Sequence, residues 1–349
     1  MSTTIALNIQ ALAQAADSVL GSIEAQSPAV FVQKELEAVK QRVLAIAEPR
    51  ALVLAEALNH SLRRTGKLFR PVILLLMVKA LNPNKAVDIA AIETAAVAEM
   101  IHTATLLHDD VLDDAELRRQ NPTINATQGN KLAILAGDYL LAQASWKLSQ
   151  LNNCRLVAIF AEVLTSLCDG ELIQLTNQNN LELSWQDYEL KTFCKTASLF
   201  QACAESAAII AQSSAHEIES LKHYGKALGM AFQLQDDLLD FTATEEELGK
   251  PVLDDVKNGI LTAPVLLALQ DTTLKPQLEA LISNVIETPS NENKQALLAL
   301  LHDSNALQQT AQLVQEYTQQ ALNSISYLAD SDYKTALMTL AQQSSCRKN

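Results

Sequence analysis

Two acidic clusters with the same internal spacing are the residues of this sequence best suited to chemistry. They are Asp109-Asp110-x-x-Asp113 and Asp236-Asp237-x-x-Asp240. On a helix, the first and last carboxylates of each cluster share one face and repel each other unless a cation lies between them. Mg²⁺ is commonly held by one or two carboxylates together with substrate phosphates. Either cluster alone fits a solvated helix face, but the repetition favours a metal clamp that binds a polyanion.

Basic residues near the first cluster could bind such an anion. Lys67 and Arg70 stand just before Pro71, which suits the first turn of a new helix. A helix N-terminus favours anions, and Arg offers phosphate a bidentate fork. Arg118-Arg119 follow the cluster, and each could hold a different phosphate group. The alternative interpretations are an ordinary basic loop and local neutralisation of the acidic cluster.

Helices must position these residues, because the composition is that of an all-α protein. Ala and Leu dominate, Gly and Pro number only nine each, and β-branched runs are short. Apolar spacing and breakers predict helices over 28–47, 71–81, 95–107, 130–150, 154–176, 185–211 and 216–239. Each acidic cluster thus follows a mostly apolar helical run. The loop expected over 241–259 is long enough to be a lid or a binding loop.

Length and charge narrow the class of protein. The 349 residues contain no evident linker, so we expect one domain over 1–349, with residues 1–27 as a docking helix or a frayed end. The net charge of −14 argues against nucleic acid or an anionic membrane as the main partner. Five scattered cysteines without zinc spacing indicate reduced thiols and a cytoplasmic location. We expect no secretory signal and no transmembrane segment.

Five short motifs, in this order and spacing, resemble those of the trans-type polyprenyl diphosphate synthases, which are all-helical isoprenoid chain-elongating enzymes. The motifs are Gly66-Lys67-x-x-Arg70-Pro71, His102-x6-Asp109-Asp110-x-x-Asp113 with Arg118-Arg119, Lys195-Thr196, Phe232-Gln233-x-x-Asp236-Asp237-x-x-Asp240, and Gly249-Lys250-Pro251. The resemblance implies a helical bundle of the isoprenoid synthase type with a central substrate cavity. It also implies a homodimer and the Mg²⁺-dependent addition of isopentenyl diphosphate to an allylic diphosphate.

The resemblance assigns roles to individual residues. The direct Mg²⁺ ligands would be Asp109, Asp113 and Asp236. Asp110, Asp237 and Asp240 would assist, some of them through water. The allylic diphosphate would be held by Arg118, Lys195, Thr196, Gln233 and Lys250. Isopentenyl diphosphate would be held by Lys67, Arg70, His102 and Arg119.

Four positions depart from the family pattern. Leu68 stands where a basic residue is usual, and Gln120 and Leu253 stand where glycine is usual. Ile260 stands where a lysine is common, and its presence removes one expected diphosphate contact. Long-chain members can also lack this lysine, so we do not interpret the change as loss of activity.

The length of the product should depend on the residues behind the first cluster. Ala104 lies five residues before Asp109; Thr105 follows it, and Met100 and Ile101 lie one turn earlier. A small residue at position 104 leaves room for a growing chain, whereas a bulky aromatic there resembles short-chain enzymes. We therefore expect a long product of the kind attached to quinones.

Three other functions are alternatives to a long-chain synthase. A shorter-chain synthase would need the tunnel to be blocked elsewhere. A terpene cyclase shares the helical fold, but it needs no isopentenyl diphosphate site such as Lys67, Arg70 and His102. A non-catalytic subunit of a heteromeric synthase should have decayed acidic motifs, and both motifs are intact here.

Overall fold

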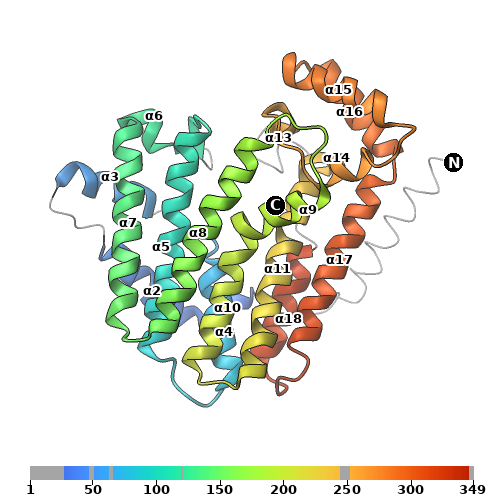
Figure 1. Ribbon diagram of the computed structural model, residues 1–349. Coiled ribbons are helices and arrows are strands. Elements are labelled where there is room, and N and C mark those ends of the chain that lie inside the picture. The colour runs from blue at the N-terminus through green and yellow to red at the C-terminus, as the bar shows by residue number, and fades with distance from the viewer. Residues whose placement is uncertain (1–26, 47–50, 63–65, 119–120, 244–251, 346–349) are drawn as a thin grey trace.

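The computed structural model describes residues 27–46, 51–62, 66–118, 121–243 and 252–345, and these ranges are almost entirely helical (Figure 1). The N-terminal elements are η1 (Pro28–Val32), α2 (Gln33–Leu44), α3 (Leu52–Leu62), α4 (Phe69–Leu81), α5 (Ile89–Leu112), β1 (Leu117–Arg118), β2 (Asn121–Pro122), α6 (Ile124–Gln128), α7 (Asn130–Gln150) and α8 (Cys154–Thr176). The remainder are α9 (Trp185–Thr192), η2 (Phe193–Ala197), α10 (Ser198–Ile210), α11 (Ala215–Thr242), α13 (Asp254–Lys257), α14 (Ala263–Ala268), α15 (Lys275–Glu287), α16 (Asn291–Asp303), α17 (Ala306–Ser324) and α18 (Asp332–Ser345). The all-α expectation is confirmed.

The main hydrophobic core lies among α4, α5, α10 and α11. Helix α5 packs against α7, α4 and α2, and α10 packs against α4 and α11. Ile73, Leu74 and Leu75 are fully buried on successive sides of α4, as expected for a helix inside the molecule. A second core lies among α14, α15, α16 and α17, and Leu234 and Phe241 of α11 belong to it. Helix α11 therefore contributes to both cores. The expectation of a single domain over 1–349 stays a prediction.

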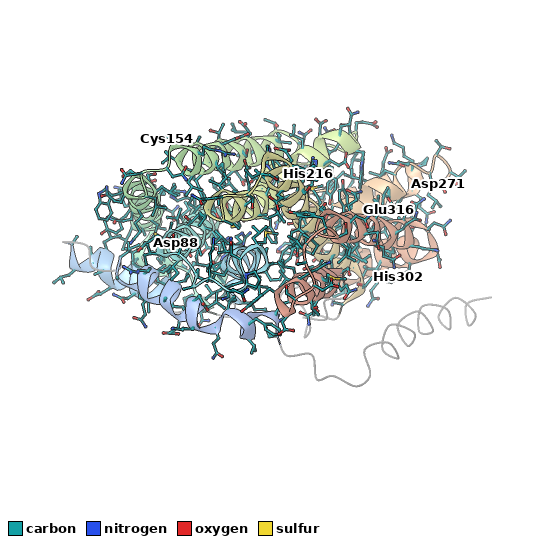
Figure 2. The ribbon with its side chains drawn as sticks, turned by 90° about the horizontal axis from the view of Figure 1, so that it is seen from below. Asp88, Cys154, His216, Asp271, His302 and Glu316 are labelled. Carbon is teal, nitrogen blue, oxygen red and sulfur yellow. The ribbon has the colours of Figure 1, made fainter. Side chains whose placement is uncertain are left out.

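The helical bundle is elongated, and the start of α5 and the start of α15 lie at opposite ends of it. Viewed from below, Figure 2 places Asp88, which precedes α5, on one side, and Asp271, which precedes α15, at the opposite end. Helices α10 and α11 lie between these ends and pack against each other. The residues of the second acidic cluster therefore lie on a central helix.

Helix α5 carries the first acidic cluster at its C-terminal end. The side chain of Asp88 caps its first turn by accepting a hydrogen bond from the Ala90 N–H at 2.8 Å. Among the described residues, α5 alone has the length and apolar composition of a membrane-spanning helix, yet more than half of its apolar stretch is buried inside the protein. We interpret α5 as a core helix.

Two glycines allow α11 to approach its neighbours closely. A Cβ atom on Gly225 would lie 2.6 Å from the Phe200 carbonyl oxygen, and one on Gly229 would lie 2.5 Å from the Cα of Ala197. Neither position has room for a side chain. This contact places the second acidic cluster, which begins about two turns beyond Gly229, near the segment that carries Lys195.

The structure differs from the predicted helices at three places that concern the site. The helix expected over 95–107 spans Ile89–Leu112, so that it includes Asp109 and Asp110. The run expected over 185–211 is interrupted by the π-helical turn η2, a feature often associated with functional sites. The loop expected over 241–259 begins later, because α11 continues to Thr242, and it contains the short helix α13. The helices expected over 130–150 and 154–176 have the predicted bounds.

Two of the departures from the family pattern adopt left-handed backbone conformations. Leu68 has φ of 50° and Leu253 has φ of 59°. Such a conformation costs a leucine about 1–2 kcal/mol, which explains why glycine suits position 253. Both leucine side chains are buried in the core, so the gain from burial offsets the backbone strain.

Candidate active site

Asp109 and Asp113 lie at the end of α5 among other charged side chains. Burial raises the pKa of Asp109 to about 6; nearby Lys195 lowers it, and Glu171 and Asp113 raise it again. Desolvation likewise raises the pKa of Asp113. Three carboxylates are thus arranged around one ammonium group, and a divalent cation would relieve their repulsion.

Lys195 projects from the π-helical turn η2 toward helix α8. Its Nζ atom donates a hydrogen bond to Glu171 Oε2 at 2.5 Å. The close packing of η2 on α8 depends on Gly170, because a Cβ atom there would lie 2.7 Å from Lys195 Cγ and 2.8 Å from Cys194 Cβ. Gly170 and Glu171 therefore position the lysine opposite the first acidic cluster.

Gly170→Ala should reduce kcat/KM about 100-fold, because the new methyl group must push Lys195 away from the site, and misplacement by about 1 Å can cost that much. Steady-state kinetics and thermal melts would test this prediction. Alanine also favours the helix by about 1 kcal/mol, so the loss of stability should be small. Glu162→Ala, an exposed change on the same helix, is the control and should have no effect. An active Gly170→Ala enzyme would show that the packing of η2 tolerates the shift.

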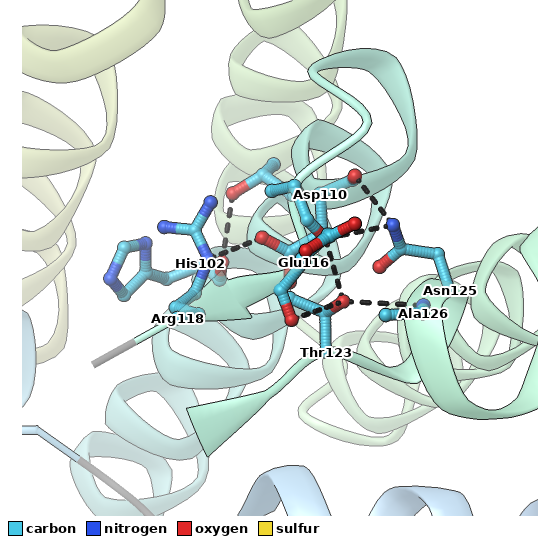
Figure 3. A network of polar contacts seen from close by, with 9 residues as sticks. His102, Asp110, Glu116, Arg118, Thr123, Asn125 and Ala126 are labelled. Atoms are coloured by element: carbon cyan, nitrogen blue, oxygen red, sulfur yellow. Dashed lines mark hydrogen bonds and ion pairs between the residues drawn. The ribbon is translucent and has the colours of Figure 1, made fainter. Parts of the chain in front are cut away.

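Asp110 faces a different neighbour. Arg118 Nε donates a hydrogen bond to Asp110 Oδ1 at 2.5 Å, and the Asn125 side-chain amide donates to the Asp110 carbonyl at 3.0 Å (Figure 3). The Thr123 hydroxyl and the same Asn125 amide also bind the Ala115 carbonyl. Asp110 therefore holds the β1–β2 ribbon and Arg118 in place, a positioning role that its motif alone does not reveal.

A cavity of about 150 Å³ lies beside this network. Its lining includes Gly66 from the basic loop, His102 and Asp110 from α5, and Arg118 from β1. The cavity thus brings Gly66, His102 and Asp110 together, whereas Lys67 and Arg70 do not line it. Arg119 and Lys250, two further predicted diphosphate contacts, lie outside the described residues.

The two predicted cations of the basic loop have different surroundings. Lys67 is exposed. Arg70 lies over the Phe200 ring at 4.9 Å, and desolvation lowers its pKa while buried Glu99 raises it. The Nε atom of Arg70 is buried and has no hydrogen-bond partner within the described chain. Glu99, one turn before His102, was not predicted from the sequence.

The second acidic cluster is organised by Asp237. This buried carboxylate accepts hydrogen bonds from the Tyr188 hydroxyl at 2.6 Å, the Gln233 side-chain amide at 2.9 Å and the Ala263 N–H at 3.1 Å. Three donors from α9, α11 and α14 leave Asp237 well satisfied, so it fixes these helices together. Asp236 is exposed, whereas Asp240 is buried.

A hydrogen-bond chain joins the second cluster to the segment that faces the first. The Thr196 hydroxyl donates to Gln233 Oε1 at 2.8 Å, and Gln233 in turn donates to Asp237. Thr196 follows Lys195, whose charge acts on Asp109 and Asp113. The predicted residues Lys195, Thr196 and Gln233 are therefore assembled between the two clusters.

The four residues expected to set product length lie inside α5. Ala104, Ile101 and Met100 are buried, and the Thr105 hydroxyl donates to the His102 carbonyl at 2.8 Å. None of the four lines the cavity beside His102. A growing chain that passes Ala104 would have to open its own path along α5.

The oxygen donors of this site fit Mg²⁺. Within the described ranges, no three His, Cys, Asp or Glu side chains converge into a metal site made of protein alone. Mg²⁺ rarely uses such cages and usually takes one or two carboxylates with phosphates and water. The raised pKa values of Asp109 and Asp113 indicate carboxylates that a cation would stabilise.

Sequence reasoning did not find Gly170, Glu171 or Tyr188. The glycine offered a signal, since Gly within an otherwise strong helix is unfavourable and often marks close packing. Nothing comparable distinguishes Glu171 from other surface acids, or Tyr188 from a core aromatic. Their roles depend on which helices become neighbours.

Comparisons with known proteins agree with this fold. The sequence pattern of the family described as Polyprenyl synthetase matches residues 52–301. The chain is 36% identical to solanesyl-diphosphate synthase 1 of Oryza sativa, over 92% of this chain and 77% of that protein. A decaprenyl diphosphate synthase from Rhodobacter capsulatus superposes with a TM-score of 0.84 at 30% identity, covering 92% of this chain and 98% of the other. A polyprenyl synthase from Caulobacter crescentus, complexed with calcium and isoprenyl diphosphate, gives a TM-score of 0.86 at 29% identity, with coverage of 92% and 97%.

Proposed function

The chain belongs to the polyprenyl synthetase family and is a prenyltransferase of the long-chain trans type, and we propose that it builds the precursor of a quinone side chain. It would do so by adding isopentenyl diphosphate units, one after another, to an allylic diphosphate. The observation that carries the proposal is the position of Lys195 and Thr196 between the two acidic clusters. The charge of Lys195 acts on Asp109 and Asp113, and Thr196 is hydrogen-bonded to Gln233, which donates to Asp237. This arrangement can hold a diphosphate and its metal ions together.

Some residues of the site would bind the metal ions, and others would bind the diphosphate that leaves when the allylic substrate ionises. Mg²⁺, held by Asp109, Asp113 and Asp236, would act as a Lewis acid and neutralise the leaving diphosphate. Lys195 and Arg118 would hold that diphosphate as prepositioned cations, which lowers the cost of the developing charge.

The reacting carbon atoms need a different environment from the diphosphates. Breaking the C–O bond leaves an allylic cation, which water would capture to give an alcohol. Leu106 and Leu107 line the cavity beside His102 and would help to keep water away from that cation. His102 and Lys67 would hold isopentenyl diphosphate with its double bond facing the cation. The new carbon–carbon bond would form first, and the released diphosphate would then accept the proton that is lost.

The direct test is chain extension. Purified protein with Mg²⁺, labelled isopentenyl diphosphate and farnesyl or geranylgeranyl diphosphate should give a ladder of products that ends at one long chain length. Chromatography of the dephosphorylated products measures that length. Products that stop at the first or second addition would indicate a short-chain enzyme. The absence of incorporation by folded protein would contradict the proposed function and point to a missing partner subunit.

The effect of Mg²⁺ on thermal stability should depend on pH. Since burial raises the pKa of Asp109 to about 6, its ionised form is disfavoured in the folded protein, and without metal its contribution to stability falls as the pH rises through that value. Mg²⁺ binds the ionised form and reverses this loss. The increase in Tm on adding Mg²⁺ should therefore be larger near pH 7.5 than near pH 5.

Asp109→Asn is the matched control for this measurement, because it removes the titrating group and keeps the side-chain size. The pH dependence of the Mg²⁺ effect should then decrease, and what remains would come from Asp113, whose pKa burial also raises. The same increase in Tm at both pH values with the unaltered protein would mean that the ion binds elsewhere.

We also propose that the protein acts as a homodimer through α7. Leu135 and Trp146 are 58% and 59% exposed and lie about three turns apart on one side of that helix. Large exposed apolar side chains on one face favour a partner surface. Leu135→Glu combined with Trp146→Glu should give a monomer by light scattering. Ile89→Glu, at an exposed apolar residue on α5, should leave the dimer intact. A dimeric double variant would place the interface elsewhere.

A further inference from the structure

Lys191 is a cation that the roles assigned so far do not use. It lies on α9, one turn before Lys195, and shares a narrow crevice with Gln174 of α8 and with Ile260 and Leu261. Its Nζ atom is 5.1 Å from the centre of the Tyr188 ring. The ammonium group therefore lies between α8 and the segment that follows α13, on the same helical run as Lys195.

The surroundings of Lys191 are those of the active site. Desolvation lowers its pKa, and the carboxylates of Asp237, Asp255 and Glu171 counteract this, while Lys195 adds repulsion. Glu171 and Lys195 also act on Asp109. Lys191 thus belongs electrostatically to the group of residues between the two acidic clusters.

Two of the three carboxylates that act on Lys191 already have other partners. Asp237 already accepts three hydrogen bonds from other groups. Glu171 forms its ion pair with Lys195. Within the described chain, Lys191 forms no ion pair of its own, although a partly desolvated ammonium group is costly without one. An anion that enters the site would provide the partner.

We propose that Lys191 is a further ammonium contact for the allylic diphosphate, one helical turn from Lys195. This inference rests on the proposed function and adds a residue to its substrate site. Two lysines at this spacing can bind different phosphate groups of one diphosphate, since residues four apart lie on one helix face. Ile260, which stands where the resemblance implies a lysine, lines the same crevice. Lys191 thus supplies from α9 the charge that position 260 lacks.

Lys191→Met and Lys191→Gln test the proposal, with Lys226→Met as the matched control. Lys226 also lies over an aromatic ring, that of Phe193 at 5.3 Å, but it is exposed on α11 and has no place in the site. Both Lys191 variants should raise the KM for the allylic diphosphate about 10-fold to 100-fold, the size expected for loss of a charge-assisted hydrogen bond. The KM for isopentenyl diphosphate should change by less than about 3-fold, within ordinary variation among surface mutants. Lys191→Arg should restore much of the affinity.

A binding measurement separates this inference from the proposed function. Calorimetric titration of inorganic pyrophosphate in the presence of Mg²⁺ requires no turnover, and its Kd should rise in Lys191→Met and Lys191→Gln but not in Lys226→Met. If the unaltered protein extends chains and the Lys191 variants keep its KM for the allylic diphosphate and its Kd for pyrophosphate, Lys191 is only structural and the inference is wrong. If the unaltered protein extends no chains, the proposed function fails, and the pyrophosphate Kd alone decides whether Lys191 binds a diphosphate.

Discussion

Asp109→Asn should lower kcat by about 1,000-fold or more while the protein remains folded. The change removes one negative charge from the group formed by Asp109, Asp113 and Glu171, and an amide cannot neutralise Mg²⁺ in the same way. Loss of one prepositioned electrostatic contact commonly costs about 100-fold to 1,000-fold, and a metal ligand should cost at least as much. Incorporation of labelled isopentenyl diphosphate under saturating substrate measures kcat directly.

Asp109→Asn should not lower the thermal stability of the metal-free protein. Burial raises the pKa of Asp109, so its ionised form is unfavourable without metal, and a neutral side chain of the same size removes that cost. The melting temperature of the metal-free variant should equal or exceed that of the unaltered protein at neutral pH.

Asp114→Asn is the matched control, since it makes the same change of charge in the same acidic stretch. Asp114 is exposed and has φ of 48°, a left-handed conformation that asparagine tolerates well. This variant should retain nearly full activity. If Asp109→Asn kept more than about a tenth of the activity, direct metal binding by Asp109 would be ruled out.

Much of the fold could be predicted because its signals are local. The bounds of α7 and α8 follow from apolar periodicity between clear breakers, and both were predicted to the residue. Lys195, Thr196 and Gln233 were also identified, although only as separate short motifs. The hydrogen bond between Thr196 and Gln233 depends on the approach of α11 to η2, which Gly229 permits.

Other features depend on packing that the sequence does not encode locally. Asp109 and Asp110 are neighbours in one motif, but adjacent residues on a helix point about 100° apart. One therefore faces Lys195, and the other binds Arg118. No pattern within the motif indicates which side meets α8 and which meets the β1–β2 ribbon. The same limit applies to the π-helical turn, because its close contact with Gly170 joins segments that are distant in the sequence.

Ala104→Phe should shorten the product to about twenty carbons or fewer. Ala104 is fully buried on α5, and a helix rise of 1.5 Å per residue places it about 7.5 Å from Asp109, roughly one and a half isoprene units. Met100 and Ile101 are buried one turn further along the same path. An aromatic ring at position 104 would fill the space that the growing product must occupy. Elongation should therefore stop after the first isoprene units are added. Sizing of the dephosphorylated products by chromatography provides the measurement.

The control for Ala104→Phe must separate a blocked path from a loosened helix. Inserting a phenyl group into a packed core costs about 1–3 kcal/mol wherever it is placed. Ala91→Phe introduces the same strain on α5, because Ala91 is also fully buried, but it lies far from the acidic cluster. It should lower stability without changing the product. If both variants shorten the chain, the general packing of α5 sets product length; if Ala104→Phe leaves the length unchanged, the growing chain does not pass Ala104 at all.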